Sequence, residues 1–122
     1  MKSEAEVQSI VRLEAARKGI RLYRNNVGAG KLENGAFIRW GLANDSAAVN
    51  DRLKSSDLIG IRAVQITPDM VGKTIGVFVC RECKREGWVY TGNDEEEAQL
   101  RFLHLIRDLG GDAGFATGEG TL

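Results

Sequence analysis

The sequence contains only one proline, two cysteines and one histidine in 122 residues. Two cysteines are too few for a disulfide-stabilised scaffold, so we expect a reducing, intracellular environment. No apolar run approaches the roughly 20 residues that a membrane helix needs, and the polar N-terminus lacks the apolar core of a secretory signal. With so little proline, turns must depend on the 15 glycines. These absences favour a cytoplasmic protein with no membrane partner.

The formal net charge is zero, because 17 Lys and Arg residues balance 17 Asp and Glu residues. The two signs are unevenly distributed. Residues 1–54 hold 10 basic and 6 acidic residues, whereas residues 55–122 hold 7 and 11. Either this split reflects chance and solvated faces, or a basic surface for a polyanion lies beside an acidic pocket for cations. Length and composition indicate a single globular domain over residues 1–122.

The pattern of apolar and turn-forming residues predicts an α/β fold. Ser3 and Glu6 have the spacing of a helix capping box, and Gly19 is suited to end that helix. Asn93 or Asp94 is suited to cap a second helix with an acidic first turn. We expect helices at 3–18 and 93–109. Strands are expected at 20–27, 36–42, 57–66 (broken at Gly60), 73–84 and 113–117, with a possible continuation of the sheet at 88–90. Turns are expected at 28–31 (flexible and basic), 33–35 and 67–69, and a loop with one short helical turn at 43–56.

Residues 75–84 form the segment with the most chemical content. Side chains alternate between the faces of a strand, so Glu82 and Lys84 share one face, whereas Cys80 and Cys83 point to opposite faces. The cysteine pair is therefore a poor metal or redox site. Asp57 begins a preceding strand, and two carboxylates from adjacent strands can bind a hard divalent cation. The alternative for Glu82 and Lys84 is a surface ion pair on an edge strand.

Six short segments, taken in order, resemble the virus-type replication-repair nuclease (VRR-NUC) domain of the PD-(D/E)xK, restriction-endonuclease-like superfamily. They are Ser3–Gln8, Tyr23–Gly30, Ser55–Ile61, Phe78–Gly87, Ala98–Leu103 and Gly110–Ala116. The resemblance covers the chain from Glu4 to about Thr117. It implies an αβββαβ core with a mixed central sheet flanked by helices, in a small stand-alone protein of the phage type.

The resemblance implies a centre for Mg²⁺ or Mn²⁺ and no small-molecule cofactor. Asp57 and Glu82 would hold the metal, together with the main-chain carbonyl of Cys83. Lys84 would orient or deprotonate the attacking water, or neutralise charge on the phosphate.

Two further positions complete the implied site. A glutamate of the first helix would join the acidic cluster; family spacing favours Glu4 over Glu6, and helix geometry does not decide between them. Gln99, on the second helix, would reach toward the site as a catalytic residue. The alternative for Gln99 is a solvated polar side chain.

Five residues are predicted to contact DNA. Arg24, Asn25 and Asn26 match an Arg-Asn element of the family, and they would touch the phosphate backbone or brace the site. The alternative is a strand end with an Asx-type turn into Gly28. Lys31 and Arg85 are candidate phosphate contacts, with simple solvation as the alternative.

The resemblance implies metal-dependent phosphodiester hydrolysis of branched DNA, most of all a four-way junction, by a homodimer similar to a Holliday-junction resolvase. The dimer would use Phe37, Ile38 and Trp40, or Trp88 and Tyr90, unless these side chains fill the core. Two other functions stay open: a catalytically silent DNA-binding or assembly module on the same fold, and a less specific flap or duplex nuclease.

Overall fold

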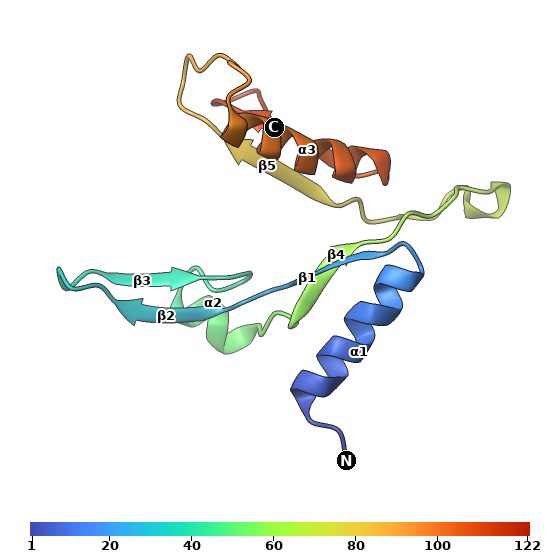
Figure 1. The fold of residues 1–122 in the computed structure, drawn as a ribbon, viewed down its shortest axis with the longest axis horizontal. Helices are drawn as coiled ribbons and strands as arrows, with labels where there is room; N and C mark the ends of the chain where they lie inside the picture. The colour runs from blue at the N-terminus through green and yellow to red at the C-terminus, as the bar shows by residue number, and fades with distance from the viewer. The chain divides into compact units, whose positions relative to one another are not determined.

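The computed structural model describes all 122 residues, which form two compact units, residues 1–60 and 61–122. Helices and strands are mixed in the chain, which confirms the α/β class (Figure 1). The strands pair in three two-stranded sheets, β1 with β4, β2 with β3, and β5 with β6. No helix combines the length and apolar composition needed to cross a membrane.

The first unit begins with α1 (Glu4–Arg17), which has the predicted capping box. The Ser3 side chain accepts a hydrogen bond from the Glu6 N–H, and the Glu6 carboxylate accepts one from the Ser3 N–H. Gly19, with φ of +72°, ends the helix in a conformation that favours glycine. The chain then enters β1 (Arg21–Arg24), which packs against α1.

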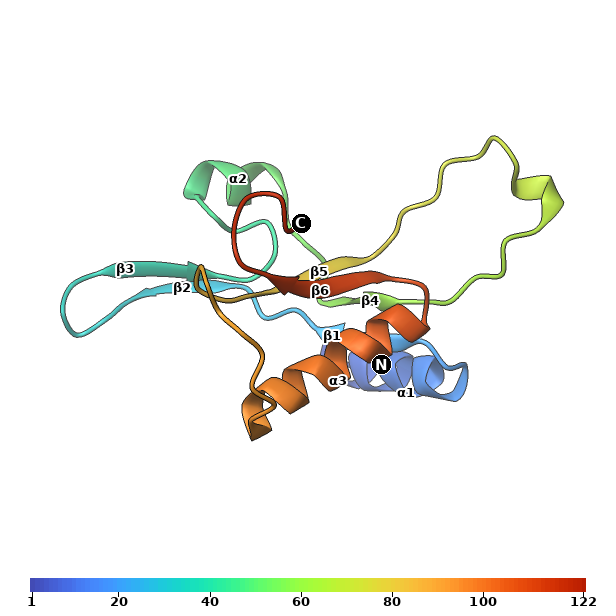
Figure 2. The same cartoon turned by 90° about the horizontal axis from the view of Figure 1, so that it is seen from above.

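A β-hairpin follows, made of β2 (Gly28–Lys31) and β3 (Phe37–Trp40) in antiparallel register. The prediction of a flexible turn at 28–31 was wrong. Gly28 forms a strand because Trp40 packs directly opposite it, and a Cβ on Gly28 would lie 2.3 Å from the Trp40 ring. Both views show the two strands running side by side (Figures 1 and 2). The hairpin turn lies at residues 32–36, around the second predicted turn at 33–35, and Gly35 there has φ of +86°.

The predicted short helical turn is α2 (Ala47–Arg52), with Ser46 as its N-cap. After it, β4 (Leu58–Ile61) runs beside β1, with the Asn25 N–H donating to the Asp57 carbonyl. Gly60 does not break this strand. It permits a close approach, because a Cβ at residue 60 would lie 1.8 Å from the Arg21 carbonyl oxygen. The predicted extension to residue 66 is absent because β1 offers only four residues to pair with.

The second unit is a β–α–β arrangement. It contains β5 (Val79–Cys83), α3 (Asp94–Asp108) and β6 (Asp112–Ala116), and the two strands are parallel. Asn93 is the N-cap of α3, one of the two predicted positions. The core lies between α3 and the sheet and is formed by Ile61, Leu103, Ile106 and Ala113, with Phe78, Cys80, Leu109 and Phe115 packed against it.

The strand predicted for residues 73–84 is shorter than expected. Its partner β6 is five residues long, so the ladder runs only from Val79 to Cys83. Residues 73–77 have no strand to pair with and are exposed. Trp88–Tyr90 does not continue the sheet either, and a short 3₁₀ helix (Pro68–Met70) occupies the predicted turn after Thr67.

Candidate functional site

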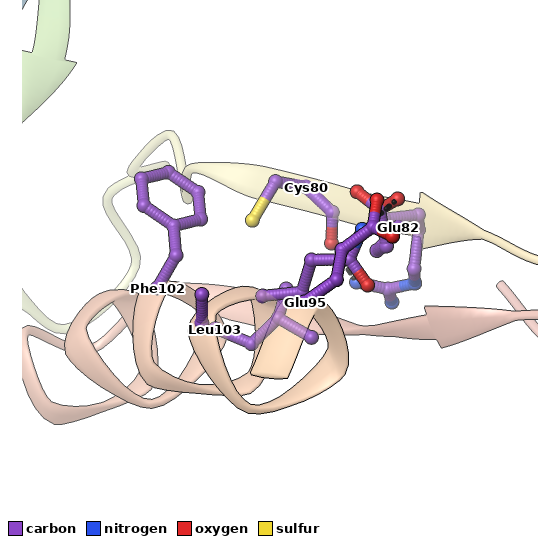
Figure 3. A pocket seen from close by; sticks show the side chains of 8 residues that line it. Cys80, Glu82, Glu95, Phe102 and Leu103 are labelled. Atoms are coloured by element: carbon purple, nitrogen blue, oxygen red, sulfur yellow. Dashed lines mark hydrogen bonds between the residues drawn. The ribbon is translucent and has the colours of Figure 1, made fainter. Parts of the chain in front are cut away.

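The second unit has a hollow of about 460 Å³ between β5 and α3. Glu82 and Cys80 enter it from the strand, and Glu95, Phe102 and Leu103 enter it from the helix (Figure 3). The hollow is therefore apolar toward the core and charged toward its outer end, where Arg81 also lines it beside the two carboxylates. This gradient follows from the alternation along β5, which turns both Cys80 and Glu82 toward α3.

Gln99 joins the two sides of this hollow. Its Nε2 donates a hydrogen bond of 3.0 Å to Oε1 of Glu82. This bond fixes the orientation of the amide, because a carboxylate oxygen can accept but an amide oxygen cannot donate. The other amide atom, Oε1 of Gln99, is buried and has no hydrogen-bond partner. A buried acceptor without a donor is uncommon in folded proteins.

Lys84 lies just beyond the end of β5, where its N–H continues the ladder by donating to the Ala116 carbonyl. Its Nζ stands over the Trp88 ring, 5.6 Å from the centroid. Trp88 packs on Phe115 of β6 at 4.7 Å between centroids, and Tyr90 also packs against this pair. The lysine is thus held beside an aromatic cluster whose negative ring face attracts its charge.

The chain after this cluster is attached to α3 through Glu96, which is only 3% exposed. The Thr91 N–H and hydroxyl donate to Glu96 Oε1 at 2.8 and 2.7 Å. These hydrogen bonds, first that of the Thr91 N–H, lower the pKa of the Glu96 carboxyl, and the positive charge of Lys84 lowers it further. Glu96 therefore restrains the segment that carries Trp88.

The other candidates in this unit have more ordinary surroundings. Cys80 and Cys83 are free thiols, and burial raises the pKa of the Cys80 thiol. Cys83 is the last residue of β5 and pairs with Ala116. Its main-chain carbonyl lies between Glu82 and Lys84 in the chain. Arg85 is exposed, and its guanidinium donates to the neighbouring Glu86 carbonyl at 3.4 Å.

The first unit has a polar hollow of its own, of about 290 Å³. It brings together residues from α1, from the end of β1 and from the chain just before β4. The lining residues are Gln8, Arg24, Asn25, Asn26, Val27, Ser55 and Asp57. Three of the predicted DNA contacts and one predicted metal ligand therefore share a single hollow.

Asn25 holds this hollow together. Its Nδ2 donates to the Ser55 hydroxyl and to the Ser56 carbonyl, both at 2.9 Å, and its Oδ1 accepts from the Leu42 N–H at 3.2 Å. Both the nitrogen and the oxygen of the side-chain amide are thus hydrogen-bonded. Of the two roles considered for Asn25, its geometry matches the bracing role, whereas Arg24 and Asn26 are exposed.

The two first-helix glutamates differ in their surroundings. Glu6 takes part in the capping box with Ser3. Glu4 lies one turn before Gln8, which lines the polar hollow, but Glu4 itself is not among the lining residues. The choice between Glu4 and Glu6 stays a prediction.

Neither unit by itself gathers three or more His, Cys, Asp or Glu side chains in an arrangement suited to a metal ion. Asp57 and Glu4 belong to the first unit, whereas Glu82, Cys83, Lys84 and Gln99 belong to the second. Their joint role stays a prediction.

Sequence reasoning missed two residues of these hollows, Gln8 and Glu95, and also the buried Glu96 beside Glu95. Gln8 could have been found from its spacing of four residues from Glu4. Glu95 and Glu96 were expected only to favour the start of α3, and no sequence signal separates the buried Glu96 from its exposed neighbours.

Comparisons of the chain with models of known protein families, with characterised proteins and with solved structures each find no match.

Proposed function

We propose that this protein is a metal-dependent endonuclease that hydrolyses phosphodiester bonds in branched DNA. The observation that carries the proposal is the hydrogen bond from Gln99 to Glu82, near the end of the strand that precedes Lys84. The order of α1, β1, β4, β5, α3 and β6 supports the αβββαβ core of the PD-(D/E)xK superfamily, with the β2–β3 hairpin and α2 placed between β1 and β4.

The chemistry of the donor set fits Mg²⁺ or Mn²⁺. The Glu82 carboxylate and the Cys83 carbonyl supply hard oxygen ligands, and the Asp57 carboxylate is a further predicted ligand. The cation would supply Lewis-acid stabilisation of charge on the phosphate.

In the proposed reaction a water oxygen forms a bond to phosphorus, and the bond from phosphorus to the 3′-oxygen breaks. The products are a 5′-phosphate and a 3′-hydroxyl, the latter carrying a proton that came from the water. Glu82 would hold the cation and Gln99 would orient Glu82. Lys84 would place positive charge near the phosphate, and its contact with Trp88 limits its side-chain freedom.

Branched DNA is proposed as the substrate because the resemblance to the VRR-NUC domain implies it. Recognition of backbone and shape is proposed because the predicted contacts Arg24, Lys31 and Arg85 are charged side chains suited to phosphates. A four-way junction presents two opposed strands, and a symmetric homodimer would present two sites to them.

The test is cleavage of a labelled four-way junction in Mg²⁺ or Mn²⁺ by the wild-type protein and by the Asp57→Ala and Lys84→Ala variants. Cleavage of the junction by the wild type, lost in both variants, is the expected result. Binding without cleavage in either metal would contradict the proposal and favour a silent DNA-binding module. Equal rates on junction, flap and linear duplex would show a less specific nuclease.

A further inference from the structure

The β2–β3 hairpin has two chemically different faces. In an antiparallel pair, residues opposite one another share a face. Trp40 and Ile38 therefore lie on one face, over the bare backbone of Gly28 and Gly30. The other face carries Lys31, Phe37 and Arg39, with Ala29 opposite Arg39. We call this second set the basic face.

The basic face is held in a defined arrangement. The Arg39 guanidinium stands over the Phe37 ring, 5.3 Å from its centroid, and its Nη1 donates to Asn44 Oδ1 at 3.1 Å. Asn44 is 3% exposed, and its Nδ2 donates to the carbonyls of Gly28 and Trp40. The base of the hairpin thus holds the Arg39 guanidinium in place before any ligand binds, which lowers the conformational entropy lost on binding.

Phe37 is left open on this face, with 57% of its surface exposed. Neither strand contains an acidic residue. Lys31 is opposite Phe37 in the register and the Arg39 guanidinium stands over its ring, so Phe37 has two basic neighbours on this face. An exposed aromatic ring flanked by cations is the combination that binds single-stranded nucleic acid, because bases stack on the ring and phosphates pair with the charges.

We propose that the basic face of the β2–β3 hairpin binds DNA where its strands are unpaired, with Phe37 stacking on an unpaired base and Lys31 and Arg39 contacting phosphates. The inference rests on the proposed function, because it assigns recognition of the branch point in the DNA substrate to this face. A second copy of the chain is a poorer occupant, because symmetric pairing of this face would bring like charges together.

The experiment measures binding by fluorescence anisotropy in a chelating buffer, which separates binding from cleavage. The probes are a labelled 12-nucleotide single strand and the blunt duplex of the same sequence, and the protein is the full chain. We expect Phe37→Ala and Phe37→Leu to weaken single-strand binding by ~5- to 150-fold, the range for one stacked base, and to change duplex binding by less than about twofold.

Matched controls come from the same unit. Ile38→Ala removes apolar surface from the opposite face, and Lys54→Gln removes one positive charge outside the hairpin. Lys31→Gln should lower the slope of log affinity against log salt by roughly 0.7 on the single strand, and Lys54→Gln should leave it unchanged. Melting temperature is measured for every variant.

Three results would overturn the inference: full single-strand affinity in folded Phe37→Leu, an equal loss in Ile38→Ala, or a lower oligomeric state of Phe37→Ala by light scattering, which would identify a contact between copies. These results are distinct from failure of the proposed function. Junction cleavage with Phe37-independent binding would reject only the hairpin assignment, whereas Phe37-dependent binding by an inactive protein would reject only the nuclease.

Discussion

Gln99 reaches from α3 to Glu82 on β5, and this single hydrogen bond of 3.0 Å crosses the charged end of the hollow in the second unit. It orients the carboxylate while leaving one buried amide oxygen without a donor. A helix residue that served only solubility would not be buried in this way. The contribution of Gln99 to the stability of the fold can therefore be tested separately from its contribution to the proposed reaction.

Glu82→Gln tests the carboxylate. The substitution keeps the shape of the side chain but removes the negative charge that a cation requires, so metal-dependent cleavage should fall by about 100-fold or more, with little change in melting temperature. Millimolar Mg²⁺ or Ca²⁺ should raise the melting temperature of the wild type and not of the variant. Glu95→Gln removes the same charge from the same hollow and should retain both metal-dependent cleavage and the rise in melting temperature with metal. Equal effects of the two substitutions would contradict a specific role for Glu82.

Gln99→Leu separates stability from activity. The variant loses a hydrogen bond to a charged group, worth about 1.5–3 kcal/mol, but it also removes a buried unpaired acceptor that costs about 1–3 kcal/mol. The free energy of unfolding, measured with urea, should therefore change by less than about 1 kcal/mol. Cleavage should nevertheless fall by about 10- to 100-fold, as for other residues that orient a metal ligand. A large loss of stability would show that Gln99 is structural.

Glu96 predicts a pH dependence of stability. Hydrogen bonds from Thr91 lower the pKa of this carboxyl below its ordinary value of 4.5, so its ionised form stabilises the folded state above that pH. The contribution is lost as the pH falls through the lowered pKa. Glu96→Gln should melt at a lower temperature than the wild type at pH 7, and the gap should narrow on acidification to pH 2–3. A gap that is constant with pH would show that ionisation of Glu96 contributes nothing.

Gly28→Ala tests the packing of the hairpin. The added Cβ would lie 2.3–2.9 Å from three atoms of the Trp40 indole, and we expect a loss of about 1–3 kcal/mol from this overpacking. Gly30→Ala is the matched control, because its Cβ would meet only one Trp40 atom, at 4.0 Å. Adding Trp40→Leu to Gly28→Ala should recover stability. Equal losses in Gly28→Ala and Gly30→Ala would point to glycine's backbone freedom instead of the indole.

Helix boundaries followed from the sequence because they depend on local chemistry. Ser3 with Glu6, and Asn93, form their caps with neighbours three residues away, so no distant contact is needed to predict them. The face shared by Cys80 and Glu82 followed from alternation along one strand. Both of these residues line the hollow against α3.

Strand lengths and close packing did not follow, because they depend on partners elsewhere in the chain. The predicted strand at 73–84 is limited to Val79–Cys83 by the length of β6, which sequence periodicity cannot reveal. Gly28 was assigned to a turn because glycine is common there, but its partner Trp40 lies twelve residues later. The bracing by Asn25 is similar, since its hydrogen-bond partners lie 17 to 31 residues away.

The parallel pairing of β5 with β6 has a consequence for the order in which the protein matures. The strand that carries Glu82 finds its hydrogen-bonding partner only at Asp112–Ala116, close to the C-terminus. During synthesis from the N-terminus, the first unit can therefore fold while β5 still lacks its neighbour. A nascent or prematurely terminated chain would display the basic hairpin but not a finished Glu82–Gln99 pair, so any ability to hold DNA would arise earlier than any ability to cut it.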